Sequence, residues 1–165
     1  MSRAALPPFQ VVLDRHGSEV LGFLRAMVGP SDAEDCFQET FLAALRAYPR
    51  ADGRNLRAWI FTIARRKAID EHRARDRRPR PLPDPERATR RDGAVAKGPE
   101  PSADDVWESV SALPPAQRAA VALRFVGDMR YREIAAALGC SEQAARRRVA
   151  DAVATLRPPD PKEAR

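Results

Sequence analysis

The stretch YREIAAALGCSEQAARRRV, residues 131–149, decides the fold of the C-terminal part of this chain. An apolar, alanine-rich run stops at Gly139, Ser141 follows shortly after it, and a second run then carries three consecutive arginines. Gly139 can take the left-handed conformation that ends a helix, and Ser141 is a good N-cap for the next helix. Two helices joined by so short a turn are typical of a helix-turn-helix unit.

The second helix of this stretch divides into an apolar side and a polar side. With 3.6 residues per turn, one side carries the apolar residues and the opposite side carries the polar ones. The apolar set is Ala145, Val149, Ala152 and Leu156, and the polar set is Glu142, Gln143, Arg146 and Arg147. A glutamine and two arginines near a helix N-terminus suit the major groove of DNA, whereas Arg148 lies on the flank. The alternative is a helical hairpin with a solvated basic face, which this stretch alone leaves open.

The composition is compatible with nucleic-acid binding but does not require it. The chain has 165 residues, room for one medium domain or two small ones, and a formal net charge of +6 from 29 Lys+Arg against 23 Asp+Glu. Lysine occurs only at three positions, so arginine carries the charge. The planar guanidinium suits phosphates and guanine edges. A genome rich in G and C would give the same Arg-, Ala- and Pro-rich usage.

The chemistry-bearing residue types do not form a catalytic or metal-binding pattern. Cys36 and Cys140 are far apart, and His16 and His72 also stand alone. We therefore expect no metal site, no cofactor and no disulfide framework, which fits a reducing cytoplasm. The sequence contains no nucleophile–base set or glycine-rich phosphate loop, so an enzyme acting on a small-molecule substrate is not expected. The N-terminus lacks the apolar core of a signal peptide, and no run of about 18 apolar residues predicts membrane insertion.

Apolar residues at three- and four-residue steps predict an all-α first lobe. The expected helices are about 8–28, from Ser31 to the proline at 49, and about 55–75, with a turn-rich loop RADGRN before the third. Ser31 and Glu34 have the spacing of a capping box. The inward stripe of the second helix is predicted to be Phe37, Phe41, Ala44, Leu45 and Tyr48.

The second and third helices carry opposite charges. Residues 31–48 contain four acids and one arginine, and the exposed face is expected to hold Asp35, Gln38, Glu39 and Leu42. A leucine among acids suits docking onto a basic protein helix, although a solvated surface with one stray leucine is the simpler interpretation. Residues 65–80 contain eight basic and three acidic residues beside Trp59 and Phe61. Basic residues near aromatic ones fit DNA with partly unstacked bases, or else the aromatic residues are core and the arginines only solubilise.

The rest of the sequence predicts a flexible linker followed by a second small helical bundle. Residues 77–103 contain six prolines and little apolar content, which predicts a flexible linker. The second lobe, 104–157, begins with a short helix containing Val106, Trp107, Val110 and Leu113, and a further helix follows LPPAQR and contains Leu123, Phe125 and Val126. The tail, 158–165, is expected to be disordered. The fold class is therefore all-α, two small helical bundles joined by a flexible linker.

Three segments in this order resemble a known family. DAEDCFQETFLAAL, NLRAWIFTIARRKAIDEHRAR and LPPAQRAAVALRFVGDMRYREIAAALGCSEQAARRRVADAVATLR together are similar to bacterial RNA polymerase sigma factors of the extracytoplasmic-function (ECF) subfamily. The resemblance covers nearly the whole chain apart from the linker and the tails. It implies sigma region 2 at 1–76 and sigma region 4, with the helix-turn-helix, at 104–157.

The resemblance also implies a set of partners and binding residues. Region 2 would dock on the clamp coiled coil of the largest subunit of core RNA polymerase, region 4 on the flap, and both would contact promoter DNA, with an anti-sigma factor as a possible further partner. The loop at 51–57 would hold a base flipped from the non-template strand. The implied polymerase-binding set is Asp35, Gln38, Glu39 and Leu42; the set for the −10 element is Asn55, Arg57, Trp59, Arg65, Arg66, Lys67, Asp70 and Arg73; the set for the −35 element is Ser141, Glu142, Gln143, Arg146, Arg147 and Arg148.

Two alternatives to a sigma factor follow from the same residues. A stand-alone helix-turn-helix regulator would need a dimerisation surface, which the sequence does not reveal, and would not need the acidic helix. A sigma-like mimic that titrates an anti-sigma factor should lack the basic DNA-facing residues, and this chain keeps them. A 27-residue tether reaches at most about 84 Å at ~3.1 Å per residue. Two weak lobes on such a tether suit DNA sites more than one helical turn apart.

Overall fold

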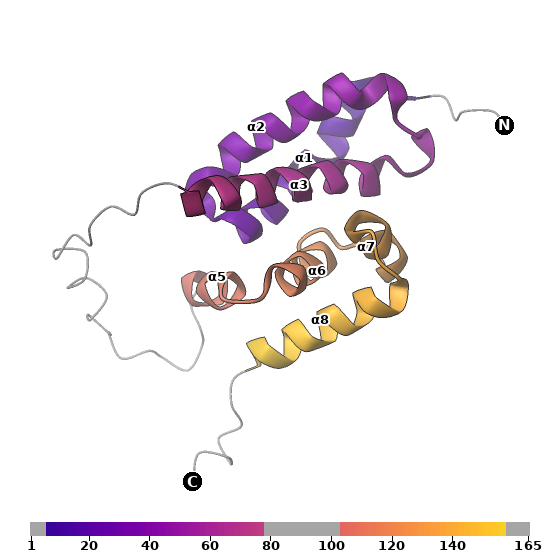
Figure 1. Ribbon diagram of the computed structural model, residues 1–165. Helices are drawn as coiled ribbons and strands as arrows, with labels where there is room; N and C mark the ends of the chain where they lie inside the picture. Colours follow the sequence, from indigo (N-terminus) through magenta and orange to yellow (C-terminus); the bar gives the residue numbers. More distant parts are fainter. Residues whose placement is uncertain (1–5, 78–102, 158–165) are drawn as a thin grey trace, which may run out of the picture.

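The computed structural model describes residues 6–77 and 103–157 and is all-α in these ranges (Figure 1). The expected linker and C-terminal tail lie outside the described residues, except that Arg77 and Ala103 end and begin helices. The first lobe contains α1 (Phe9–Val28), α2 (Pro30–Ala47), two 3₁₀ turns, η1 (Tyr48–Arg50) and η2 (Gly53–Asn55), and α3 (Leu56–Arg77). The second contains α5 (Ala103–Ser111), α6 (Pro115–Phe125), α7 (Tyr131–Leu138) and α8 (Glu142–Leu156).

The junction between α1 and α2 corrects one prediction from the sequence. Gly29 has φ 88°, a backbone conformation that glycine adopts without strain, and it separates the two helices by a single residue. Proline is favoured in the first helical turn, so α2 begins at Pro30 rather than after Ser31. The predicted capping box of Ser31 and Glu34 is therefore wrong, since Ser31 already lies inside the helix and no side chain caps its N-terminus.

The core of the first lobe is built from aromatic rings on all three helices. Phe23 of α1 and Phe61 of α3 are fully buried and meet edge to face, with ring centroids 5.5 Å apart. Phe41 is buried as predicted, whereas Leu45 is 51% exposed, so its place in the inward stripe is wrong. α2 ends at Ala47, and the 3₁₀ turn η1 follows directly. The ring of Tyr48, the first residue of this turn, packs on that of Phe9 of α1, with centroids 5.1 Å apart.

The turn between α7 and α8 follows the sequence prediction closely. Gly139 has φ 62° and ends α7, and the hydroxyl oxygen of Ser141 accepts a hydrogen bond of 3.1 Å from the Ala144 N–H. The left-handed glycine and the serine N-cap are both confirmed. Cys140, which lies in this turn, is half-buried. The α7 N-terminus has a cap of its own, because the Glu133 carboxylate accepts from the Arg130 N–H at 2.9 Å.

The two lobes pack against each other and share one apolar core. In Figure 1 the helices of the second lobe lie directly beneath α1 and α3. The fully buried residues Phe23 and Phe61 belong to the same continuous cluster as Leu123 of α6 and Ile134 of α7. The sequence left the relative placement of the lobes open, and the structure places the inner faces of α1 and α3 against α6 and α7.

Candidate functional site

The acidic face of α2 gathers the four predicted polymerase-binding residues on one surface. Asp35, Gln38, Glu39 and Leu42 are all exposed, and they line a shallow hollow of about 370 Å³ together with Asp32 and Glu71. Leu42 is 53% exposed, although it is a large apolar side chain. The hollow therefore combines a row of acceptors with one apolar anchor, which is the pattern that a basic amphipathic surface of another protein would complement.

The residues predicted for the −10 element do not all share one face of α3. Positions 59, 66, 70 and 73 follow one another at helical spacing, so they lie on one side of the helix. Arg66, Asp70 and Arg73 are exposed there, and Trp59 is half-buried. The ring of Trp59 contacts that of Tyr48, with centroids 5.9 Å apart, which fixes the indole at the border of core and surface. This side of α3 offers two cations and an aromatic ring to a ligand.

Three further side chains predicted for the −10 element lie elsewhere on α3. The Nζ of Lys67 lies 3.2 Å from a carboxylate oxygen of Glu39, so it borders the acidic face of α2. Arg57 lies on the opposite side of α3 from Trp59 and Arg66, and its side chain is only 22% exposed. It is directed at the second lobe, so the structure separates it from the exposed basic face. Arg65, half-buried, lies between the two sides.

The loop before α3 forms a small polar hollow. The side-chain oxygen of Asn55 accepts from the Ala58 N–H at 3.0 Å and so caps α3, which leaves the amide group exposed at the rim. The hollow has a volume of about 330 Å³, and Asn55 and Arg57 line it together with His16 of α1. His16 Nδ1 is buried with no hydrogen-bond partner. Burial lowers the pKa of His16, more strongly than the nearby Glu19 carboxylate raises it.

The polar side of α8 is exposed along its length. Gln143, Arg146 and Arg147 all face solvent, and the side chains of the two arginines are 61% and 84% exposed. Arg146 lies 2.5 Å from a carboxylate oxygen of Glu142 and stacks over the ring of Tyr131 at 4.9 Å. Exposed ion pairs of this kind contribute only about 0–1 kcal/mol, so both guanidinium groups can exchange their partners for phosphates or base edges.

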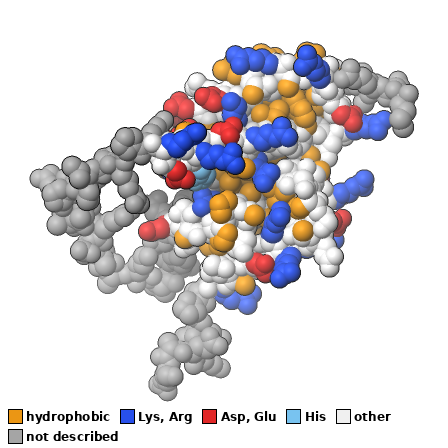
Figure 2. Space-filling view, in the orientation of Figure 1, with side chains coloured by type: hydrophobic (Ala, Val, Ile, Leu, Met, Phe, Trp, Pro, Cys, Tyr) orange, Lys and Arg blue, Asp and Glu red, His pale blue; other side chains and the backbone are white. Residues whose placement is uncertain are grey.

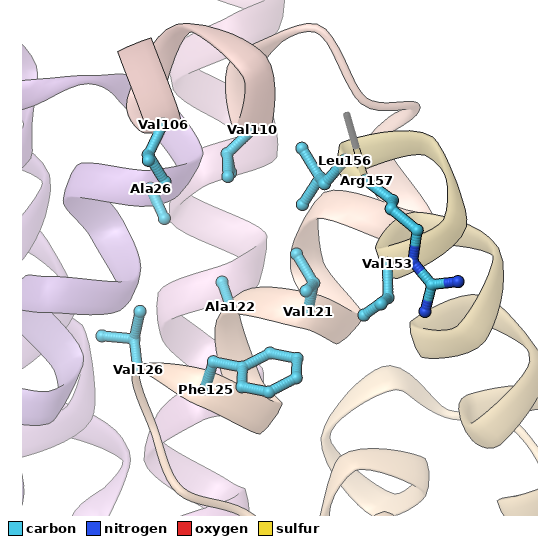
Figure 3. Close-up of a pocket in the computed structure, with 10 residues that line it drawn as sticks. All are labelled: Ala26, Val106, Val110, Val121, Ala122, Phe125, Val126, Val153, Leu156 and Arg157. Carbon is cyan, nitrogen blue, oxygen red and sulfur yellow. The ribbon is translucent and has the colours of Figure 1, made fainter. Parts of the chain in front are cut away.

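An apolar groove lies between α5, α6 and α8 of the second lobe (Figure 3). It has a volume of about 410 Å³, and the side chains of α6 and α8 face each other across it. Phe125 is 65% exposed and Val106 is 46% exposed, and both line this groove. The other lining residues are Ala26, Val110, Val121, Ala122, Val126, Val153, Leu156 and Arg157.

The structure also identifies residues that the sequence analysis missed. Arg118 of α6 is only 9% exposed, and it donates hydrogen bonds to the carbonyl oxygens of Met27 and Leu113, both at 3.1 Å. Burial lowers the pKa of this guanidinium. Glu19 of α1 lies between His16 and Arg57, 3.6 Å and 3.2 Å away. A single buried arginine in a charged sequence gives no signal, because its partners are backbone carbonyls far away along the chain.

The two cysteines differ in their surroundings, and neither forms a disulfide. Cys36 is buried between α2 and α3, where burial and then the carboxylates of Glu71 and Glu39 raise the pKa of its thiol to about 11. A thiol with so high a pKa is a poor nucleophile at neutral pH.

Basic side chains are scattered over the face of the molecule seen in Figure 2. Lys and Arg are spread there with apolar area between them. Within residues 6–77 and 103–157, no group of three or more metal-ligating side chains comes together. In the same ranges no helix is long and apolar enough to cross a membrane.

Comparisons with known proteins match both lobes to one family. The Sigma-70 region 2 model matches residues 12–78, and the Sigma-70, region 4 model matches residues 103–156. The ECF RNA polymerase sigma factor RpoE of Cereibacter sphaeroides is 31% identical over 144 residues, which cover 79% of this chain and 74% of the relative.

Solved structures give the same result for the fold. CnrH, solved in complex with the cytosolic domain of CnrY, superposes with a TM-score of 0.66 at 28% identity, covering 90% of this chain and 84% of that one. The sigma factor RpoE in complex with the anti-sigma factor NepR from Bartonella quintana gives a TM-score of 0.64 at 25% identity, covering 90% and 91%.

Proposed function

Because the chain belongs to the ECF RNA polymerase sigma factors, we propose a division of labour among its exposed faces in transcription initiation. A sigma factor directs RNA polymerase to promoter DNA, and this chain has both regions needed for that role. Sigma factors are transcription factors rather than enzymes. We place the protein in the cytoplasm, where RNA polymerase acts.

The exposed face of α2 is the proposed contact with core RNA polymerase. Asp35 and Glu39 would pair with basic residues of the clamp coiled coil, and Gln38 would add a hydrogen bond. Leu42 would supply the apolar anchor, since a buried leucine at the centre of an interface contributes more than a rim charge. The support is that all four side chains are exposed on one surface around one hollow.

The outer side of α3 is the proposed contact with the −10 element. Arg66 and Arg73 would bind phosphates, and Trp59 would offer a ring to an unstacked base. The Asp70 carboxylate lies between them and would repel a phosphate placed directly opposite it. The hollow beside Asn55 is the proposed place for the flipped base of the non-template strand. Arg65, Lys67 and Arg57 would join only if their side chains reorient.

The polar side of α8 is the proposed contact with the −35 element. Gln143, Arg146 and Arg147 would reach base edges in the major groove, since arginine pairs with guanine and glutamine with adenine. Ser141 and Glu142 lie at the helix start, where the N-terminus favours a phosphate. Arg148, on the flank, would contact phosphate.

The apolar groove of the second lobe is the proposed contact with the polymerase flap. An amphipathic helix of the flap could lay its apolar side against Phe125 and Val153. An anti-sigma factor is a proposed further partner. The structural relative RpoE was solved with the anti-sigma factor NepR, and CnrH was solved with the cytosolic domain of CnrY.

The observation that carries this proposal is that acidic, basic-aromatic and helix-turn-helix faces are exposed together on three different helices. The test is run-off transcription with purified core polymerase on fragmented genomic DNA of the host, with and without the protein. We expect defined transcripts only when the protein is present. Binding of core without any transcript, or no binding of core, would contradict the proposal.

A further inference from the structure

A basic pocket lies where the ends of α1 and α3 and the start of α2 meet α5 and α6. Figure 1 shows the C-terminal end of α3 and the start of α5 at the same end of the molecule. The pocket has a volume of about 720 Å³, which lies within the range of ~300–1,000 Å³ that is usual for small-molecule sites. The charged and titratable side chains that line it are Arg25, His72, Arg75, Glu108 and Arg118.

Arg25 provides a cation at this pocket that the protein itself does not use. It lies in the last turn of α1, and its side chain is exposed. Within residues 6–77 and 103–157, its guanidinium group forms no ion pair and no hydrogen bond. A guanidinium group binds a phosphate through two parallel hydrogen bonds, so Arg25 can contact an anion without giving up another partner.

Arg118 places a buried positive charge in the wall of the pocket. Its side chain donates to the carbonyl oxygens of Met27 and Leu113, but Nε is buried without a hydrogen-bond partner. No carboxylate of the described residues forms an ion pair with this guanidinium group. A buried cation without an anionic partner is costly, so an anion bound in the pocket would be stabilised by Arg118 even without touching Nε.

The start of α2 adds positive character to the same pocket. Gly29 and Pro30 line it, and no side chain caps the N-terminus of the helix that begins at Pro30. The first N–H groups of a helix lack partners within it, and the helix dipole places a partial positive charge there. Arg75 donates to Val28 O at 3.1 Å and pairs with Asp32, so its charge is partly compensated.

The basic pocket is separate from the surfaces assigned to polymerase and to promoter DNA. None of its lining residues belongs to the sets proposed for core polymerase, the −10 element or the −35 element, and only Ala26 also lines the apolar groove. Its wall combines three guanidinium groups and one carboxylate with apolar side chains such as Val28 and Pro30. This composition suits a ligand that has both phosphate groups and an organic part.

We propose that the basic pocket binds a small phosphorylated ligand of the size of a nucleoside diphosphate. Phosphate oxygens would accept hydrogen bonds from Arg25 and Arg75 and would compensate the buried charge of Arg118. The organic part of the ligand would contact the apolar side chains of the pocket, and the Glu108 carboxylate would oppose binding of the phosphates. This inference goes beyond the proposed function, because it requires no contact with polymerase or promoter DNA.

Isothermal titration calorimetry of the full-length protein at low salt tests the site, with ADP, inorganic pyrophosphate and adenosine as probes. We expect ADP to bind and to raise the melting temperature, since a ligand that binds only the folded state stabilises it. Pyrophosphate should bind more weakly, and adenosine should not bind. Arg25→Gln should weaken ADP binding about tenfold, because it removes charge-assisted hydrogen bonds to phosphate. The matched control is Arg46→Gln, at an exposed arginine in the last turn of α2, and it should change the affinity less than about twofold.

A change of opposite sign is expected at the rim of the pocket. Glu108→Gln should strengthen ADP binding about threefold, because it removes a carboxylate that repels the phosphates. The proposal is overturned if ADP does not bind, or if sodium sulfate at the same ionic strength raises the melting temperature equally. Equal losses of affinity in Arg25→Gln and Arg46→Gln would overturn it as well. If pyrophosphate binds as tightly as ADP, the organic part is not recognised and the proposed ligand class is wrong.

Discussion

α3 and α8 both carry arginines that we assign to promoter DNA, but the two helices hold these side chains in different ways. On α8, Arg146 and Arg147 are exposed and form ion pairs with acids of their own helix, and Arg146 also stacks on the ring of Tyr131 of α7. On α3, Arg57 is mostly buried and contacts groups from α1, α7 and the turn before it. Arg118 is buried even further, with backbone carbonyls as partners.

This difference separates cations that are available to a ligand from cations that hold the lobes together. An exposed arginine gives up a weak ion pair when it binds DNA, whereas a buried one leaves unsatisfied acceptors behind. The two lobes therefore differ: the arginines of the proposed −35 surface are exposed, whereas Arg57 of the proposed −10 set is already engaged by other groups of the protein. Each prediction below tests where this boundary lies, from the largest expected effect to the smallest.

The largest effect is expected at Arg118, the most buried cation of the described residues. Arg118→Ala removes the arginine donor from Leu113 O and one of the two partners of Met27 O, which keeps His72 Nε2 at 2.7 Å. An unsatisfied carbonyl oxygen costs about 1–3 kcal/mol, and a lost hydrogen bond to a charged group adds a similar amount, so the free energy of unfolding should fall by about 3 kcal/mol. Urea denaturation followed by circular dichroism measures it.

Arg124→Ala on the same helix is the control for that measurement. Arg124 is 37% exposed and pairs with the exposed Asp128 within the second lobe, so its removal should cost under about 1 kcal/mol. Equal losses of unfolding free energy in the two variants would mean that the buried hydrogen bonds of Arg118 stabilise the fold no more than an exposed ion pair does.

The next largest effect concerns the exposed pair on α8. Arg146→Ala with Arg147→Ala should reduce initiation at promoters that depend on a −35 element by about 30-fold, because each arginine pairing with a base contributes roughly 1–3 kcal/mol. Quantitative run-off transcription measures this, and the affinity for core polymerase should not change. Arg148→Ala on the flank should weaken binding evenly across DNA sequences. If the double variant also loses core binding, the assignment of α8 to DNA alone is wrong.

The sequence predicted the elements well and their mutual packing poorly. The helical periodicity, Gly139 and Ser141 placed the helix-turn-helix correctly, because local patterns and caps depend on neighbouring residues. The start of α2 was predicted one residue too late. Gly29 has a positive φ and Pro30 begins the helix directly after it, so Ser31 lies inside α2 and does not act as its N-cap.

The contact between the two lobes could not be predicted from the sequence. Arg57 and Gly127 are 70 residues apart, and Arg118 and Met27 are 91 apart. Their partners are backbone carbonyls, which leave no mark in a sequence. Apolar stripes show that a helix has an inner face but not which helix covers it, so the exposure of Phe125 and Val106 at a groove could not be predicted from the sequence.

A smaller effect is expected on the acidic face of α2, where two leucines provide a matched pair. Leu42 is 53% exposed within the proposed polymerase contact, and Leu45 is 51% exposed outside it. Leu42→Arg should weaken core binding about tenfold, because it replaces an apolar anchor with a charge that repels a basic surface. Leu45→Arg should change it less than twofold. Competition binding to core polymerase measures the affinity of both variants. Equal losses of affinity would show that the contact is not centred on Leu42. Asp35→Arg should add to the effect of Leu42→Arg.

The smallest effect is a pH dependence at His16, beside the engaged Arg57. Burial lowers its pKa from the ordinary value of 6.5, the Glu19 carboxylate partly opposes this, and Arg57 and Arg15 reinforce it. A base with a lowered pKa in the folded state binds a proton less readily than in the unfolded chain, so the stability it contributes is present above about pH 6.5 and is lost as the pH falls through that value. The melting temperature of the wild type should therefore drop more between pH 7.5 and pH 5.5 than that of His16→Gln. An equal or smaller drop in the wild type than in His16→Gln would contradict this prediction.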